Sequence, residues 1–307
     1  MLSGKQVVVN KVAVYNGHSD CIYTMLAGPT ANTFFTTGAD GMVVHWDINT
    51  PNEGTLIAKM PKSVYAMALA NQGTQLLVAQ NFEGIHLLDL ATKQELATKA
   101  LGNVAIFDLL IAENQILVAL ANGQVIKLAY SQLEIIHQAR HTEQSARRFA
   151  QHPSLPGVVA VAYSDGVIRL LETNTLKIVE ELKSHTNSVF AVQFSPDGKY
   201  LLSGGRDAKL KVWDTHDNFR LVQDIPAHLF AINDIYFHPF KPLFATCSMD
   251  KSVKVWSAET FKLLKVIDKS RHAGHGNSVN RLLWTTTDEL LISTGDDRNI
   301  HLWKLSL

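Results

Sequence analysis

A short block of residues that recurs along the chain constrains the fold more than any other feature of the sequence. It is clearest at residues 201–214 (LLSGGRDAKLKVWD) and returns at 36–47, 246–257 and 293–304. In each copy a Ser or Thr stands four positions before an acidic residue and ten positions before a Trp. A unit that repeats at a regular period predicts a repeat architecture, in which each unit buries its apolar face against its neighbours.

Seven units of similar length follow from the Trp position of this block. At intervals of 40 to 47 residues, that position holds Trp46, Leu88, Leu128, Leu171, Trp213, Trp256 and Trp303. Within a unit apolar and polar residues alternate, and Gly, Asp and Asn cluster between the alternating runs. This pattern predicts short antiparallel strands joined by tight turns, about four strands in each unit. Because repeated units share a continuous core, we expect one domain over residues 1–307 instead of the two that length alone suggests.

A histidine precedes the acidic residue by 22 positions in the first, fifth, sixth and seventh units. These histidines are His18, His185, His228 and His275. Together with the Ser or Thr, the Asp and the Trp, this series resembles the WD-repeat (WD40) β-propeller family, and the resemblance covers essentially the whole chain. It implies an all-β, seven-bladed propeller with four antiparallel strands in each blade, arranged around a central channel.

The resemblance also implies a buried, hydrogen-bonded tetrad in each of these four blades. Trp can only donate a hydrogen bond, Ser, Thr and neutral His both donate and accept, and Asp accepts. Joined in a chain, the four side chains satisfy one another, where an unpaired buried polar group would cost about 1–3 kcal/mol. We therefore interpret the recurring polar residues as structural ties. The predicted tetrads are Trp46–Thr36–His18–Asp40, Trp213–Ser203–His185–Asp207, Trp256–Thr246–His228–Asp250 and Trp303–Ser293–His275–Asp297.

Units two to four depart from this pattern. The tetrad positions hold Met60, Val78, Phe82 and Leu88 in unit two, and Ala100, Val118, Asn122 and Leu128 in unit three. Unit four keeps His141 and Asp165 but has Val161 and Leu171. Replacing a complete polar network by apolar groups is often nearly neutral for stability, so these blades need not be weak.

The last unit lacks an outer strand of its own. Such a strand follows the Trp position in other units, for example at 176–182 and 261–267, but only four residues follow Trp303. The run QVVVNKVAV at residues 6–14 is typical of a strand and has no unit before it. We predict that it supplies the outer strand of the last blade, which closes the ring and removes an exposed edge.

The composition argues against several classes of protein. The chain carries 28 Lys and Arg against 28 Asp and Glu, so it lacks the basic surplus typical of nucleic-acid binding. No run of about 18 apolar residues predicts a membrane span, and the first residues lack the apolar stretch of a signal peptide. Cys21 and Cys247 are too few for a disulfide framework, which favours a reducing compartment. We expect a cytoplasmic protein that binds neither nucleic acid nor membranes.

No motif in the sequence requires catalysis, a cofactor or a metal. His272 and His275 come closest to ligand spacing, but His275 belongs to a predicted tetrad, so we interpret this segment as a surface-loop insertion. Ser248 and Lys251 match the S-x-x-K signature of serine acylases, yet they fall on a blade turn and the accompanying motifs are missing. We therefore expect no catalytic residues, no metal and no cofactor.

The resemblance implies a binding face. WD-repeat propellers mostly bind proteins or peptides, often on the face where the loops after the second and fourth strands of each blade open around the central channel. Two positions in each unit typically contribute there. The residue five after the position of the tetrad His gives Tyr23, Tyr65, Phe190, Asn233 and Asn280, and the degenerate units three and four add Phe107 and Arg147. The residue before the tetrad Asp gives Ala39, Asn81, Ala121, Ser164, Arg206, Met249 and Asp296. Phe107 holds its place if unit three is shortened at its 113–115 turn; otherwise Ala105 takes that place.

Tyr, Phe, Arg and Met are the residue types enriched at the buried centres of protein interfaces. Packing against neighbouring blades is the alternative role for the aromatic members. We predict a non-enzymatic scaffold that docks a protein or peptide segment through Tyr23, Tyr65, Phe107, Arg147, Phe190, Arg206, Asn233, Met249, Asn280 and Asp296. Two other functions stay open: a propeller enzyme, such as a metal-assisted hydrolase or lactonase at the channel mouth, and a structural subunit that uses its rim.

Overall fold

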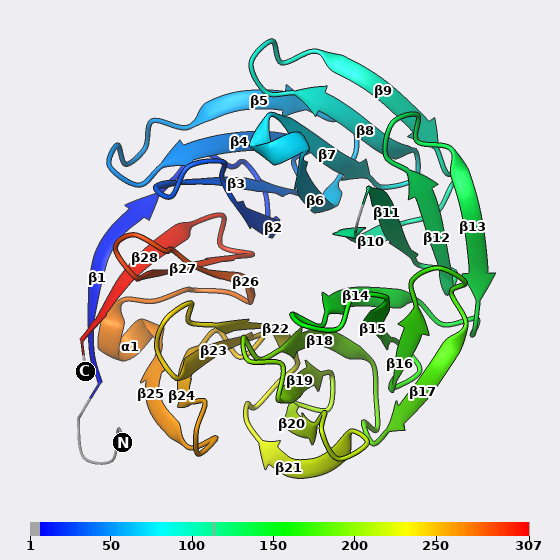
Figure 1. The fold of residues 1–307 in the computed structure, drawn as a ribbon. Helices are drawn as coiled ribbons and strands as arrows, with labels where there is room; N and C mark the ends of the chain where they lie inside the picture. The colour runs from blue at the N-terminus through cyan, green and yellow to red at the C-terminus, as the bar shows by residue number, and fades with distance from the viewer. Residues whose placement is uncertain (1–6, 113, 307) are drawn as a thin grey trace. The chain divides into compact units, whose positions relative to one another are not determined.

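The structure, a computed structural model, describes residues 7–112 and 114–306. Over these residues the chain forms 28 β-strands, one short α-helix and one 3-10 turn. The strands make seven separate four-stranded sheets, and neighbouring strands pair antiparallel (Figure 1). The prediction of an all-β, seven-bladed propeller with four antiparallel strands in each blade is therefore confirmed.

The chain divides into two compact units, which we call the middle unit (Met60–Ala231) and the terminal unit (residues 1–59 together with 232–307). The expectation of one domain over residues 1–307 stays a prediction. The middle unit holds the sheets of blades two to five, together with the 3-10 turn η1 (Asn71–Gly73). Their strands are β6 (Val64–Ala70), β7 (Gln75–Gln80), β8 (Gly84–Asp89) and β9 (Glu95–Ala100); β10 (Ile106–Ala112), β11 (Gln115–Leu120), β12 (Gln124–Ala129) and β13 (Ile135–Arg140); β14 (Ala146–Gln151), β15 (Val158–Tyr163), β16 (Val167–Glu172) and β17 (Ile178–Lys183); β18 (Val189–Phe194), β19 (Tyr200–Gly205), β20 (Lys209–Asp214) and β21 (Arg220–Pro226).

The terminal unit holds the sheets of blades one, six and seven. Their strands are β2 (Ile22–Ala27), β3 (Thr33–Gly38), β4 (Met42–Asp47) and β5 (Thr55–Lys59); β22 (Ile232–Phe237), β23 (Leu243–Ser248), β24 (Val253–Ser257) and β25 (Leu263–Ile267); β26 (Val279–Trp284), β27 (Leu290–Gly295), β28 (Ile300–Ser306) and β1 (Val8–Tyr15). The helix α1 (Lys269–His272) lies in the connection between blades six and seven.

The position of a strand within its sheet follows from its residues. Second strands such as β11 (QILVAL) and β15 (VVAVAY) are nearly continuous apolar runs, and they are buried on both faces. Outer strands such as β13 (IIHQAR) mix polar and apolar residues and are largely exposed. Apolar surface is thus concentrated in the middle of each sheet, where a neighbouring sheet can cover both faces.

Each hydrophobic cluster of the core is shared by two adjacent sheets. In the middle unit Leu77 and Ile85 of blade two pack with Ile116 and Ile126 of blade three. The same kind of cluster joins blades three and four, and blades four and five. In the terminal unit one cluster joins blades one and seven, and another joins blades six and seven. The repeat units therefore build a shared core within each unit, as the periodicity predicts.

The N-terminal strand completes the sheet of the last blade. β1 pairs antiparallel with β28 from Val8 opposite Ser306 to Tyr15 opposite Ile300. Figure 1 shows the two strands side by side, β1 in blue and β28 in red. The prediction that an N-terminal run joins the last blade is confirmed, and Gln6, its first predicted residue, lies outside the described residues.

Candidate functional site

The first predicted tetrad is a complete hydrogen-bonded chain. Trp46 Nε1 donates to Thr36 Oγ1 (2.7 Å), and Thr36 Oγ1 lies 2.8 Å from His18 Nε2. His18 Nδ1 lies 2.9 Å from Asp40 Oδ2. Because the indole can only donate, the Thr hydroxyl is left to donate to Nε2, and Nδ1–H then donates to the carboxylate. All four side chains of this tetrad are therefore hydrogen-bonded to one another within the blade.

The fifth and seventh blades repeat this tetrad with the same geometry. In blade five the distances are 3.0 Å from Trp213 Nε1 to Ser203 Oγ, 2.8 Å from Ser203 Oγ to His185 Nε2 and 2.9 Å from His185 Nδ1 to the nearer oxygen of Asp207. In blade seven the corresponding distances through Trp303, Ser293, His275 and Asp297 are 2.9, 2.8 and 2.9 Å. In the sixth blade Trp256 Nε1 donates to Thr246 Oγ1 at 2.9 Å. His228 belongs to the middle unit and Asp250 to the terminal unit, so that pairing stays a prediction.

The tetrad carboxylates of Asp40, Asp207 and Asp297 are held in their ionised form. Burial alone would raise the pKa of Asp297, but the hydrogen bond and the charge of His275 outweigh it and lower the pKa to about 2. The same opposition of burial and histidine lowers the pKa of Asp40 and of Asp207. A carboxylate that stays ionised and fully hydrogen-bonded is a poor proton donor at neutral pH, which fits a structural role.

The histidine cluster of the seventh blade does not fit a metal site. Ligand atoms of His275, Asp297 and His301 lie within 4.8 Å of one another. Both ring nitrogens of His275 are already used, Nδ1 with Asp297 and Nε2 with Ser293. A metal ion would have to take His275 from its tetrad, and the cost of a broken buried network opposes this.

The residues that match S-x-x-K lie in a turn and have turn contacts. Ser248 ends β23, and its hydroxyl accepts a hydrogen bond from the backbone N–H of Asp250 (3.0 Å). Lys251 takes the left-handed conformation, with φ of 70°, at the following position. These contacts belong to the connection between two strands.

Blade four replaces the tetrad by a different polar cluster, which the sequence reasoning missed. Arg169 pairs with Asp165 (2.9 Å) and with Glu181 (2.9 Å), and its guanidinium lies 4.7 Å from the centre of the Tyr163 ring. His141, at the tetrad position, bonds to the carbonyl of Leu176 instead (2.9 Å). An Arg two positions before the unit's Trp position, opposite an acidic residue in the next strand, is the signal that could have identified this pair.

The first strand of every blade carries a β-bulge, and the bulged residue belongs in each case to the first predicted binding set. In β10, for example, Ile106 and Asp108 pair with neighbouring residues of β11, and Phe107 between them has no partner. Phe107 therefore occupies this position, and Ala105 does not. A bulge re-aims a side chain out of the regular pleat. The seven bulged residues, all half-buried, are Tyr23, Tyr65, Phe107, Arg147, Phe190, Asn233 and Asn280.

In the middle unit the four bulged side chains form one continuous stack. The rings of Tyr65 and Phe107 are 5.7 Å apart and inclined by only 19°. The Arg147 guanidinium lies 4.1 Å from the centre of the Phe107 ring and 4.8 Å from that of Phe190. Each cation–π contact contributes about 0.5–2 kcal/mol. Four successive blades thus present one ordered row of aromatic and cationic side chains, which we call the aromatic stack.

In the terminal unit the bulged positions are mainly polar. Asn233 Nδ2 donates to Ser278 Oγ (3.0 Å) and to the carbonyl of Val279 (2.8 Å). Asn280 Nδ2 donates to the carbonyl of Ile22 (2.9 Å) and to Asp296 Oδ1 (2.7 Å). These amides link adjacent blades, so they order the structure whether or not a partner binds.

The second predicted set lies at the same end of the sheets as the bulges. The backbone N–H of Arg206 donates to the carbonyl of Ser188 (2.8 Å), and that of Asp296 donates to the carbonyl of Ser278 (2.9 Å). Each acceptor residue directly precedes the first strand of its blade, and each donor directly follows the second strand. We call this end of each sheet the bulge end. Arg206 is exposed there, and the Met249 side chain is 51% exposed.

Three exposed apolar residues at the bulge end of the middle unit were missed. Leu229 is 84% exposed and Phe230 61% exposed, in the loop that leads to the first strand of blade six. Two apolar residues directly after a tetrad His were the available signal, because the first, fifth and seventh repeats have polar or small residues at those two positions. Phe82 does not fill the buried place of the Asp that it replaces: at φ of 62° in the turn after β7, it is 53% exposed.

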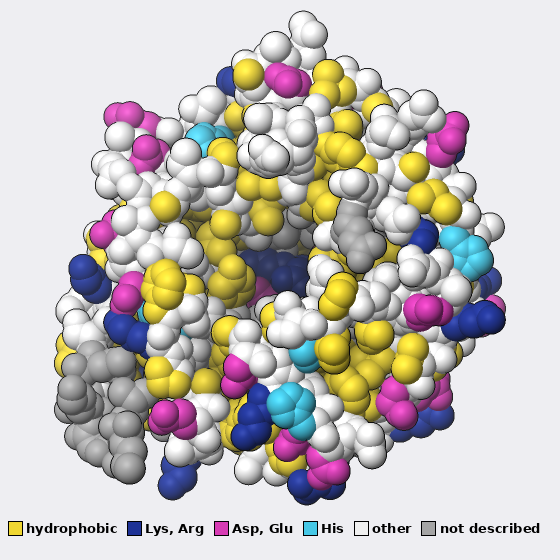
Figure 2. Space-filling model, in the orientation of Figure 1, with side chains coloured by type: hydrophobic (Ala, Val, Ile, Leu, Met, Phe, Trp, Pro, Cys, Tyr) yellow, Lys and Arg dark blue, Asp and Glu magenta, His cyan; other side chains and the backbone are white. Residues whose placement is uncertain are grey.

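Charge is mixed on the face of the molecule shown in Figure 2. Figure 2 shows Lys and Arg interspersed with Asp and Glu over the face that it presents, without a large field of one sign. Within residues 7–112 and 114–306, no helix combines the length and the apolar character that a membrane crossing needs.

Comparison with protein families matches four segments of this chain to the model WD40, described as "WD domain, G-beta repeat". The segments are residues 9–47, 176–214, 219–257 and 266–304, which together make up just over half of the 307 residues. Each segment ends one residue after a tetrad Trp. The matches therefore fall on the four units for which the sequence predicts complete tetrads.

Several curated proteins are similar to this chain at low identity. Nuclear distribution protein PAC1 of Arthroderma benhamiae is 29% identical over 183 residues, which cover 55% of this chain and 38% of that protein. Striatin-4 of Homo sapiens is 25% identical over 247 residues, covering 79% of this chain and 28% of that protein. Striatin of Homo sapiens is 23% identical over 278 residues, covering 81% and 35%. The chain spans less than half the length of these relatives.

Proposed function

Because the chain belongs to the WD domain, G-beta repeat family, we propose that it is a non-enzymatic scaffold that binds a protein or peptide segment. The segment docks at the bulge end of the sheets. The scaffold works in the cytoplasm without a cofactor, and its partner is neither a nucleic acid nor a membrane. The observation that carries this proposal is the aromatic stack of Tyr65, Phe107, Arg147 and Phe190 in the middle unit.

The aromatic stack has the physical properties of a binding hot spot. Its side chains are half-buried, so each keeps surface that a partner can cover. The Arg147 guanidinium lies over both Phe rings, and these contacts order its side chain before any partner arrives. Pre-ordering lowers the entropy lost on binding, and aromatic and Arg side chains contribute most of the affinity at typical interfaces.

Exposed apolar residues extend the aromatic stack at the bulge end of the middle unit. Single exposed apolar side chains are common on soluble proteins. Leu229, Phe230 and Phe82 are more than half exposed and share one end of the sheets with the stack, and such a concentration is typical of interaction surfaces. In this proposal Arg206 adds a charge at the edge of the same surface.

The terminal unit contributes in the same proposal through Tyr23 and Met249. Tyr23 occupies the bulge of β2, and the exposed Met249 follows β23. Asn233, Asn280 and Asp296 set the polarity of this part of the surface, since hydrogen bonds to neighbouring blades order the two Asn side chains and Asn280 donates to Asp296 within its own blade. A partner that presents backbone amides or carbonyls can bind to such fixed polar groups without reordering them.

A pull-down of proteins from lysate with the variant Phe190→Ala/Phe230→Ala tests this proposal. We expect the captured proteins, quantified by mass spectrometry, to fall by about tenfold or more, because hot-spot truncations typically cost more than 2 kcal/mol. The melting temperature should change by only about 3 °C, since neither side chain is fully buried.

The matched control is Ile178→Ala/Val179→Ala on the outer strand β17, where both side chains are exposed. This variant should capture the same proteins as the wild type. Capture that survives the Phe190→Ala/Phe230→Ala change and is lost with the β17 variant would contradict docking at the bulge end, and would favour a structural subunit that uses its rim.

A further inference from the structure

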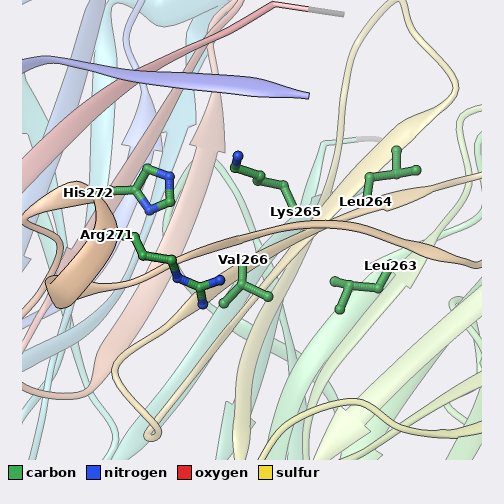
Figure 3. Close-up of a pocket in the computed structure, with 6 residues that line it drawn as sticks. All are labelled: Leu263, Leu264, Lys265, Val266, Arg271 and His272. Carbon is green, nitrogen blue, oxygen red and sulfur yellow. The ribbon is translucent and has the colours of Figure 1, made fainter. Parts of the chain in front are cut away.

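A pocket in the terminal unit lies beside the outer strand of blade six. The connection between blades six and seven folds into the single-turn helix α1, and the pocket lies between this helix and β25. Its volume is about 460 Å³, and its lining residues are Leu263, Leu264, Lys265, Val266, Arg271 and His272 (Figure 3). None of these residues belongs to a tetrad or to the bulge end.

The pocket follows the edge of β25. Its lining includes four consecutive residues of that strand, Leu263 to Val266. The strand carries a β-bulge at Leu264, which has no pairing partner on β24, and a surface that touches four residues in a row across this bulge runs along the strand's edge. Among the described strands, β25 pairs with β24 alone. The free edge therefore offers backbone N–H and C=O groups to an added strand.

The pocket is basic within a chain of zero formal net charge. Residues 262–272 contain four Lys and Arg and one Asp, whereas the whole chain carries 28 of each sign. Arg271 pairs with Asp268, which neutralises part of its charge. Lys265 has no ion-pair partner among the described residues, and Lys262 and Lys269 are exposed on either side. A negatively charged ligand is the complement of this lining.

His272 adds an unsatisfied polar atom to the same wall. Its Nδ1 is buried and has no hydrogen-bond partner among the described residues. Burial, together with the charges of Lys265 and Arg271, lowers the pKa of His272, while Asp268 opposes this. Because this nitrogen is not accessible to solvent, a ligand can bond to it only after the ring turns, and the bond would then satisfy a group that is unfavourable when left unpaired.

We propose that the groove between β25 and α1 binds an acidic, extended peptide segment of a partner protein, which adds to the sheet of blade six as a fifth strand. The backbone edge of β25 supplies the pairing, Lys265 selects for carboxylates, and Val266, its neighbour on the opposite face of the strand, contacts apolar residues that alternate with them. A duplex nucleic acid fits less well, because phosphate recognition needs several cations at once, and here apolar side chains form half of the lining.

Binding of a labelled peptide tests the proposal on the complete chain. The probe alternates Val and Glu over eight residues, and fluorescence anisotropy measures its affinity. A peptide with Gln in place of Glu should bind at least about tenfold more weakly, and so should the acidic peptide with two central residues changed to Pro, which cannot pair as a strand. Hydrogen exchange of the β25 amides should slow when the acidic peptide is bound.

Charge reversal identifies the residue responsible. Lys265→Glu should weaken the acidic peptide by about tenfold or more, since it replaces attraction by repulsion in the groove. Lys99→Glu is the matched control, because Lys99 is likewise half-buried on an outer strand, β9, and this change should leave the affinity unaltered. Unfolding curves of both variants should match the wild type, so that a loss of affinity reports the groove.

Several results would overturn the proposal. They are equal binding of the Gln or Pro peptides, an unaltered affinity in Lys265→Glu, or duplex DNA binding as tightly as the peptide without protection of β25. The variant Phe190→Ala/Phe230→Ala should bind the acidic peptide normally. This groove and the proposed docking at the bulge end can therefore fail independently of each other.

Discussion

At the scale of single residues, His301 couples the stability of the fold to pH. Its ring stacks on His275, with centroids 4.1 Å apart, and its Nδ1 is buried without a hydrogen-bond partner. Burial, with the nearby His275 and Lys11, lowers its pKa to about 3. As the pH falls below the ordinary value of about 6.5, the unfolded chain takes up this proton first. His301 therefore contributes stability that is complete above pH 6.5 and is lost progressively toward pH 3.

We predict that His301→Phe flattens this pH dependence. Phenylalanine keeps a ring for the stack and removes the titrating group. Urea unfolding at successive pH values should show a smaller fall in the free energy of unfolding between pH 6.5 and 3, by up to about 1.4 kcal/mol for each pH unit. The remaining fall belongs partly to His238, whose pKa burial lowers to about 4. An unaltered slope in the variant would contradict this role of His301.

The recurring residue spacing, together with the resemblance to the WD-repeat family that it carries, was enough to predict the tetrads of blades one, five and seven, because each member has a hydrogen-bonding partner at a fixed distance along the sequence. The pairs His18–Asp40 and His185–Asp207 lie where the 22-residue spacing places them. The exposed Phe82 could not be predicted in this way. Its side-chain direction depends on a left-handed turn conformation, with φ of 62°. An aromatic residue rarely adopts this conformation, so the residue type alone does not predict it.

At the scale of elements, the N-terminal strand β1 should contribute measurably to the stability of the fold. It pairs with β28 along seven residues, and Tyr15 at its end is fully buried against Phe34 and Trp46. Deleting residues 1–14 exposes the edge of β28 together with part of this core. We expect the melting temperature to fall by about 10 °C or more, because each kcal/mol lost shifts it by about 2–4 °C in a chain of this size.

Deleting residues 1–6 alone is the control for this prediction, since it leaves β1 in place. Differential scanning calorimetry of the two truncations separates the strand from the residues before it. A melting temperature that is the same for both truncations and for the wild type would show that β1 adds nothing to the seventh blade.

The periodicity of the sequence predicted which elements exist, but the surfaces between elements were less accessible to it. The alternation of apolar and polar residues indicated the strands, and the strand-like run at 6–14, which has no repeat before it, indicated the extra strand of the last blade. The aromatic stack required knowing that four successive bulges aim Tyr65, Phe107, Arg147 and Phe190 along one row. The pocket beside β25 depends on how the 47-residue last repeat folds its extra residues into α1, and a loop without periodicity gives no such signal.

At the scale of the whole molecule, two proposed surfaces of different chemistry share a scaffold without net charge. The aromatic stack offers rings and a guanidinium that two of the rings hold. The groove beside β25 offers a lysine without an ion-pair partner among the described residues and a free strand edge. Because the 28 basic and 28 acidic residues balance, long-range attraction to the molecule as a whole is weak. Local chemistry then decides which segment of a partner binds at which surface.

The dependence of binding on salt should separate the two surfaces. Between 50 and 500 mM NaCl the screening length falls from above about 10 Å to well below it, which weakens attraction between exposed charges and leaves apolar contacts largely unaffected. We expect the acidic peptide at β25 to lose about tenfold in affinity over this range, while the partner captured at the aromatic stack changes by less than about threefold. Isothermal titration of both ligands against the same preparation measures this. If both affinities fell equally with salt, the partner at the stack would be recognised mainly through the charges of Arg147 and Arg206. The aromatic rings of the stack would then contribute to the packing of this protein and not to the affinity for the partner.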